Sequence, residues 1–171
     1  MTEQVTFKGA ALTLSGGLPK VGEKFPECTL VNQEMQSIKL SSLQGKPLLI
    51  LSVPSLDTEV CQKEGRRFHM EVAKFESKVQ LIIVSMDLPF AQKRWCGQEG
   101  IKNMVTLSDF KYKDFAHKLG LEIKELGLLA RAVFLCDHKM VLRQVHLVKE
   151  ITNEPPYTVV IEQLNHLLAK T

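Results

Sequence analysis

Apolar residues along the chain follow two patterns, short aliphatic runs and stripes with helical spacing. Runs in which aliphatic residues predominate occupy 48–53 and 79–85, and such runs, bounded by polar or turn residues, are typical of buried strands. Between them, a stretch from about 57 to 77 carries a stripe at helical spacing, made of Cys61, Gly65, Phe68, Val72 and Phe75. This stripe predicts a helix with one face packed on the sheet. Strand, helix and strand in this order form a right-handed unit with parallel strands.

Weaker patterns on both sides of this unit complete an α/β fold with a mixed sheet. Alternation at 5–8 and 11–14, around Gly9-Ala10, predicts an N-terminal β-hairpin. Further strands are expected at 29–31, 37–40, 105–107, 130–136 and 141–147, and further helices at 88–96, 113–119 and 156–169. Gly65 lies on the buried stripe, so we interpret it as a point of close backbone approach. A chain of 171 residues is most simply one domain, covering 1–171.

Composition and charge exclude several classes of function. The net charge of +3 comes from scattered side chains, so we expect no nucleic-acid surface. No apolar segment approaches the length of a membrane span. The first residues, Met1-Thr2-Glu3-Gln4, lack the basic region and apolar core of a secretory signal, so a cytoplasmic protein is expected.

In that compartment structural disulfides are unusual, so the 4 cysteines do not predict a disulfide framework. There is no C-x-x-C or H-x-x-x-H pattern, and Cys136-Asp137-His138 is only a weak metal pattern at a strand end. We therefore expect no metal. Cys28 and Cys136 lie in apolar strand patterns and are interpreted as inert core residues.

Cys61 lies where the long helix is expected to begin, directly after a buried strand. The segment Pro54-Ser55-Leu56-Asp57-Thr58-Glu59-Val60-Cys61 supplies capping residues and acidic side chains for a first helical turn. Unpaired N–H groups and the positive end of the helix dipole stabilise an anion there. Because the thiolate is the reactive form of cysteine, Cys61 is the candidate nucleophile.

Thr58 and Arg131 are the candidates to assist this thiol. Thr58 lies three positions before Cys61, so its hydroxyl either donates to the thiolate or serves only as a helix cap. Arg131 opens an apolar strand, where a charge must meet a partner or solvent. It is either a cation beside the thiolate or a structural ion-pair partner of Glu59 or Glu125.

Cys96 is expected at the opposite kind of helix end. A short helix with Asp87 as its cap and Pro89 in its first turn is expected to finish near Cys96, with Gly97 as the left-handed residue. The negative end of the dipole disfavours a thiolate there, so Cys96 is expected to stay a thiol. The alternative is that Trp95 and Cys96 only fill the core.

The segment from Pro54 to Cys61 resembles the peroxiredoxin active-site motif, Pro-x-x-x-Thr-x-x-Cys, and its full form is similar to the thiol peroxidase branch, the atypical two-cysteine peroxiredoxins of bacteria. The segments at 5–16, 87–97 and 130–133 are similar to that family's N-terminal hairpin, resolving-cysteine segment and active-site arginine strand. The resemblance implies a thioredoxin-like sandwich with an N-terminal β-hairpin. The stretch 62–65 is more polar than is usual in the family.

The resemblance also implies a mechanism. Cys61 would be the peroxidatic cysteine, which reduces hydrogen peroxide and organic hydroperoxides and becomes a sulfenic acid, with Pro54 shielding it and with Thr58 and Arg131 orienting thiolate and peroxide. Cys96 would resolve the sulfenic acid as an intrachain disulfide, recycled by thioredoxin. A homodimer is implied, and no metal, haem or flavin.

Two other functions use the same residues. A thioredoxin-fold redox sensor or thiol-dependent chaperone would form the same disulfide but turn over slowly. A cysteine hydrolase is weakly supported, because no histidine is marked as its partner base. A disulfide between Cys61 and Cys96 would join the start of one helix to the end of another, and it requires their Cα atoms to lie within about 7 Å of each other. We therefore predict that a segment around one of the two cysteines moves on oxidation.

Overall fold

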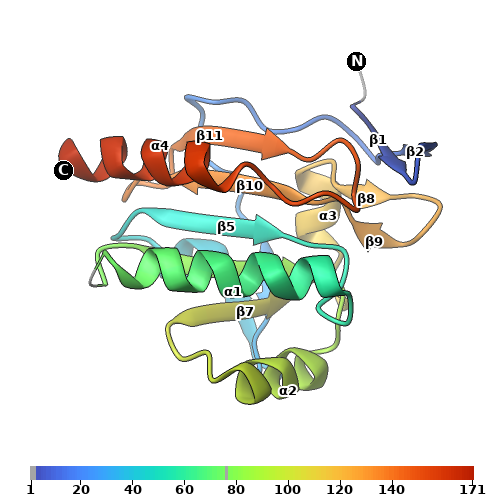
Figure 1. The fold of residues 1–171 in the computed structure, drawn as a ribbon, viewed down its shortest axis with the longest axis horizontal. Coiled ribbons are helices and arrows are strands. Elements are labelled where there is room, and N and C mark those ends of the chain that lie inside the picture. The colour runs from blue at the N-terminus through green and yellow to red at the C-terminus, as the bar shows by residue number, and fades with distance from the viewer. Residues whose placement is uncertain (1–2, 76) are drawn as a thin grey trace.

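The computed structural model describes residues 3–75 and 77–171, which form a mixed sheet with helices on both faces (Figure 1). The 7-stranded sheet has the order β11-β10-β5-β6-β7-β3-β4. Its strands are β3 (Thr29–Val31), β4 (Ser37–Lys39), β5 (Leu48–Ser52), β6 (Gln80–Ser85), β7 (Met104–Ser108), β10 (Ala132–Cys136) and β11 (Leu142–Leu147). The central strands β5, β6 and β7 are parallel, and antiparallel strands flank them on both sides.

The helices divide the core into two layers. One face of the sheet packs against α1 (Glu59–Ala73), α2 (Pro89–Glu99) and α4 (Tyr157–Ala169). The other face packs against α3 (Asp114–Lys118) and the two small hairpins, β1 (Gln4–Phe7) with β2 (Ala10–Thr13) and β8 (Glu122–Ile123) with β9 (Leu128–Leu129). A short 3-10 helix, η1 (Leu40–Leu43), precedes β5. Every residue of β5 is buried, because successive side chains enter opposite layers.

The structure confirms the predicted strand, helix and strand unit and the N-terminal hairpin, in which Val5 pairs with Leu12. The long helix is shorter than expected, from Glu59 to Ala73 instead of 57–77, and residue 76 lies outside the described residues. Gly65 is a close-approach site as predicted, since a Cβ there would lie 2.6 Å from Cη2 of Trp95 on α2. The two helices that carry Cys61 and Cys96 are therefore in direct contact.

The predicted ends of the second helix were wrong. Helix α2 continues to Glu99, and Gly100, with φ 64°, is the left-handed residue instead of Gly97. The cause lies in the tertiary structure, because Ile101 is buried. Its N–H donates to the carbonyl of Cys96 at 3.0 Å, so the helix ends about one turn later than predicted. At the other end Leu88, not Asp87, is the N-cap, without a side-chain capping bond among the described residues.

Candidate active site

Cys61 is the third residue of α1, in the turn that follows β5. Thr58 is the N-cap and has extended backbone angles, so the helix begins at Glu59. Pro54 is buried between the strand and this turn, and Cys61 itself is fully buried. The thiol therefore lies inside the protein, in the first turn of α1, which is the position that the sequence predicted.

Arg131 lies beside Cys61, at the start of β10. Its Nη1 lies 3.4 Å from Sγ of Cys61 and donates at 2.6 Å to Oε2 of Glu64. Its Nε and Nη2 donate to the carbonyl of Ile151 at 3.2 and 2.9 Å. Glu64 and the carbonyl of Ile151 thus hold the planar guanidinium from two sides, and Nη1 is directed at the sulfur of Cys61.

Glu64 is the site residue that the sequence did not single out. The expected partners of Arg131 were wrong: Glu59 is exposed, and the carboxylate of Glu125 accepts the N–H of Thr13. Glu64 follows Cys61 by three positions and so shares its helix face. The unusual polarity of 62–65 could have indicated Glu64 from the sequence, because a carboxylate next to a buried stripe needs a cation as its partner.

The ion pair of Glu64 and Arg131 is isolated from solvent. Burial raises the pKa of Glu64 to about 7, although Arg131 opposes that rise. Burial also opposes the charge on Arg131, but Glu64 and Cys61 together raise its pKa. Oε1 of Glu64 has no hydrogen-bond partner within the described part of the chain. The pair therefore places a permanent cation, partly neutralised, against the sulfur of Cys61.

The hydroxyl of Thr58 donates to the carbonyl of Ser55 at 2.8 Å. Thr58 is the N-cap by position, but in the described structure its side chain makes no capping bond. Its hydroxyl therefore fills neither of the two expected roles, and instead closes the turn that leads from Pro54 into α1. That turn leads directly into the helix that carries Cys61.

Cys96 lies in the last turn of α2 and is buried. Burial raises the pKa of its thiol, and hydrogen bonds with the side chains of Gln33 and Thr106 partly offset this effect. All four cysteines are described and are free thiols. Burial thus favours the thiol form of Cys96 over the thiolate.

Cys61 and Cys96 are separated by the packing of their helices. Trp95 contacts Gly65, which lies four residues, about 6 Å, further along α1 than Cys61. The indole of Trp95 therefore packs between the two helices next to Cys96, and both Cys61 and Cys96 are free thiols.

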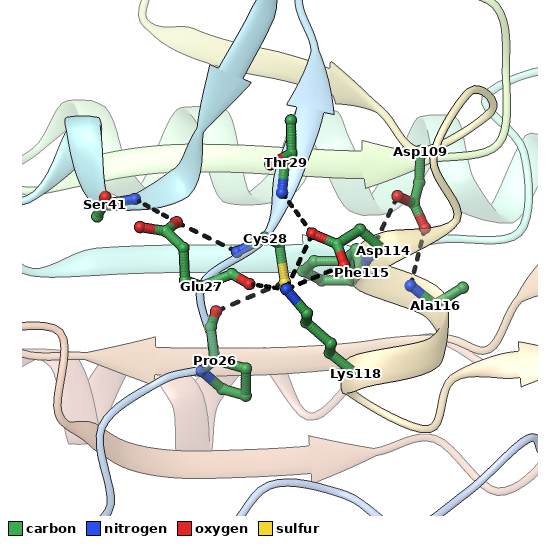
Figure 2. A network of polar contacts seen from close by, with 10 residues as sticks. All are labelled: Pro26, Glu27, Cys28, Thr29, Ser41, Asp109, Asp114, Phe115, Ala116 and Lys118. Carbon is green, nitrogen blue, oxygen red and sulfur yellow. Dashed lines mark hydrogen bonds and ion pairs between the residues drawn. The ribbon is translucent and has the colours of Figure 1, made fainter.

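The other two cysteines lie in the second core layer. Burial raises the pKa of both Cys28 and Cys136 to about 12. Figure 2 shows Cys28 under a polar network in which Nζ of Lys118 donates to the carbonyl of Glu27 at 2.7 Å and to Asp114 at 3.2 Å. Lys118 is therefore engaged with oxygen acceptors, and both thiols lie within a closed core.

The described residues contain neither a cluster of metal ligands nor a helix suited to a membrane. No group of three or more His, Cys, Asp or Glu side chains in these residues is arranged to hold a metal ion. Among the same residues, no helix has the length and apolar character needed to cross a bilayer.

Comparisons with known proteins agree with this geometry. Residues 20–161 match the family model described as Redoxin. The thiol peroxidase of Oceanobacillus iheyensis is 44% identical over 161 residues, which cover 94% of this chain and 98% of that protein. A peroxiredoxin-like protein from Aquifex aeolicus, 40% identical, has a TM-score of 0.89 over 98% of both chains. The thiol peroxidase from Chromobacterium violaceum, 20% identical, shares the fold, with a TM-score of 0.86 over 98% of both chains. The chain therefore has the thioredoxin-like peroxiredoxin fold and belongs to the Redoxin family and, within it, to the thiol peroxidases.

Proposed function

We propose that this thiol peroxidase reduces hydrogen peroxide and organic hydroperoxides through Cys61. The thiolate attacks the terminal oxygen of the hydroperoxide, the O–O bond breaks, and the alcohol or water leaves with a proton. Cys61 becomes a sulfenic acid. The observation that carries the proposal is the distance of 3.4 Å between Nη1 of Arg131 and the buried sulfur of Cys61.

Arg131, Thr58 and Pro54 have separate roles in this step. The Arg131 cation stabilises the thiolate and the negative charge that develops on the leaving oxygen. Thr58 shapes the turn in front of the sulfur through its bond to Ser55. Pro54 is buried at the same turn, and it shields the thiolate from water.

Cys96 is the proposed resolving residue. Its thiol attacks the sulfenic sulfur of Cys61, a disulfide forms, and water leaves. Cys61 lies in the first turn of α1 and Cys96 in the last turn of α2, whereas the Cα atoms of a disulfide lie within about 7 Å of each other. We therefore propose that part of α1 or α2 unwinds first. The residues from Gly97 to Gly100 are exposed, so the end of α2 is the looser side.

A dithiol protein then reduces the disulfide by exchange, and the family resemblance makes thioredoxin the proposed reductant.

We also propose a single domain over 1–171, a cytoplasmic location, and a homodimer with contacts around the active-site loop. The exposed apolar side chains of Leu88 and Phe90, at the start of α2, support such a contact, because they are 50% and 64% exposed.

Repeated turnover tests the proposed function. We expect the protein to consume many equivalents of hydrogen peroxide with thioredoxin, its reductase and NADPH. The Cys61→Ser variant is expected to be inactive, and Cys96→Ser to consume peroxide without thioredoxin-dependent recycling. Mass spectrometry after one equivalent of peroxide should find the Cys61–Cys96 disulfide. A disulfide that includes Cys28 or Cys136 would contradict the assignment, and the Cys28→Ser variant is the matched control.

The same assay separates the proposal from the sensor or chaperone alternative. A sensor forms the disulfide with peroxide but consumes few equivalents, whereas a peroxidase continues until NADPH is exhausted.

Substitution of Thr58 tests the role of its hydroxyl. Thr58→Val removes the bond to Ser55, so peroxide attack should slow roughly fivefold, which corresponds to about 1 kcal/mol for one hydrogen bond. Thr58→Ser keeps the hydroxyl and should react close to the wild-type rate. The measurement is the second-order rate constant of Cys61 with peroxide. Equal rates for Val and Ser variants would show that the hydroxyl has no part in the reaction.

A further inference from the structure

Asp87 connects β6 to α2, but its carboxylate faces the active-site turn and does not cap the helix. Oδ1 accepts the hydroxyl of Ser55 at 2.7 Å. Oδ2 accepts the backbone N–H of Leu56 at 2.7 Å and the hydroxyl of Ser85 at 2.7 Å. Hydrogen bonds to an ionised carboxylate are among the stronger ones in proteins. Asp87 therefore fixes the turn that precedes Thr58 and Cys61.

The same residue is tied to the helix that carries Cys96. The hydroxyl of Ser108 donates to the backbone carbonyl of Asp87. Nε2 of Gln92, on α2, donates to Oγ of Ser85 at 3.1 Å and to the carbonyl of Leu107 at 2.9 Å. Ser85, Gln92 and Ser108 are all fully buried. This network makes the first half of α2 and the ends of β6 and β7 one rigid support for the turn.

We propose that Asp87 is a positioning residue that holds the peroxidatic turn in its closed, peroxide-reactive form. The inference rests on the proposed function. The turn includes buried Leu56, whose carbonyl accepts the side chain of Gln62 on α1, so the turn and the helical residues around Cys61 move together. The closed form favours attack on peroxide, and the opened form favours contact between Cys61 and Cys96.

The carboxylate therefore sets the fate of the sulfenic acid. While the turn stays closed, Cys96 cannot reach Cys61, and a second hydroperoxide converts the sulfenic acid to a sulfinic acid with release of water or alcohol. When the turn opens, the Cys96 thiol forms the disulfide. Loss of the Asp87 bonds should slow the first oxidation, accelerate disulfide formation and lower the yield of sulfinic acid.

The Asp87→Ala variant tests this inference by stopped-flow fluorescence. Trp95 is the single tryptophan and packs between α1 and α2, so it reports both steps. Loss of one hydrogen bond to a charged group corresponds to about a tenfold change, and Asp87→Ala removes three such bonds. We therefore expect the peroxide step to slow by at least about tenfold and the disulfide step to accelerate by a similar factor. Mass spectrometry at increasing peroxide should find less sulfinic acid per turnover. The Asp87→Asn variant keeps one acceptor oxygen, so both of its rates should lie between those of the wild type and of Asp87→Ala.

Asp57→Ala is the matched control. Its carboxylate lies in the same turn but is exposed, and among the described residues its one ion-pair partner is Arg94, at 3.8 Å. An exposed pair contributes little, so both rates should stay within about twofold of wild type. If Asp87→Ala does not fold, Ser55→Ala removes one of the three carboxylate bonds and should shift both rates in the same directions.

Two results would overturn the inference: unchanged rates in Asp87→Ala, or equal slowing of both steps. The wild-type protein separates this failure from failure of the proposed function. If wild type forms no disulfide with peroxide, the function itself is wrong. If wild type does so and the Asp87 variants match it, only the role of Asp87 is wrong.

Discussion

Replacement of Arg131 by methionine is expected to reduce both peroxide reactivity and stability. The variant lacks the cation that lies 3.4 Å from the sulfur of Cys61, and loss of one such donor slows a reaction roughly hundredfold or more. It also leaves Glu64 buried without a counter-ion. Removal of one partner of a buried ion pair costs about 3 to 5 kcal/mol. The measurements are the rate constant with hydrogen peroxide and the free energy of unfolding in urea at pH 7.

A double variant separates these two effects. Arg131→Met combined with Glu64→Leu replaces the ion pair by apolar side chains of similar size, so most of the lost stability should return. The peroxide rate should remain low, because the cation is still absent. If the double variant recovers peroxide reactivity together with stability, Arg131 is a structural residue and has no direct part in the chemistry.

The second large effect is a pH dependence of stability that originates at Glu64. Burial raises the pKa of Glu64 from 4.5 to about 7 in the folded protein. The folded state therefore binds a proton more tightly than the unfolded state, and this contribution to stability is complete below about pH 4.5. It is lost as the pH rises through about 7. The loss amounts to about 3 kcal/mol across that window.

The Glu64→Gln variant isolates this contribution. Asp109 is also buried, with a pKa raised to about 6, and it titrates in the same window in both proteins. The difference in unfolding free energy between wild type and Glu64→Gln cancels that effect. Between pH 4.5 and 7.5, we expect the free energy of unfolding of the wild type to fall relative to that of Glu64→Gln. A difference that stays constant with pH would show that Glu64 is ionised throughout, with Arg131 fully compensating its burial.

The sequence alone predicted the elements whose patterns are local. Runs of aliphatic residues placed β5 and β6, and the stripe through Cys61 and Phe68 placed α1 between them. A right-handed crossover follows from these three elements because the handedness of connections is nearly invariant. The position of Cys61 in a first helical turn followed from capping chemistry within eight residues.

The ends of α2 required the tertiary structure. Gly97 and Gly100 are both suitable for the left-handed position, and local chemistry does not choose between them. Burial of Ile101 decided in favour of Gly100. Asp87 fits a helix cap equally well in sequence. In the structure, however, its carboxylate accepts two donors from the turn at Ser55, the Ser55 hydroxyl and the Leu56 N–H, and a third from Ser85 at the end of β6.

Residue type and short-range spacing were enough to predict two candidate reactive cysteines, the type of fold and the need of Arg131 for a partner. The tertiary structure decided which carboxylate is that partner. Glu64 and Arg131 are 67 positions apart, and only the packing of α1 over the start of β10 brings Oε2 of Glu64 within 2.6 Å of the guanidinium. Long-range pairing of charges depends on which strands become neighbours, and that is a property of the whole sheet.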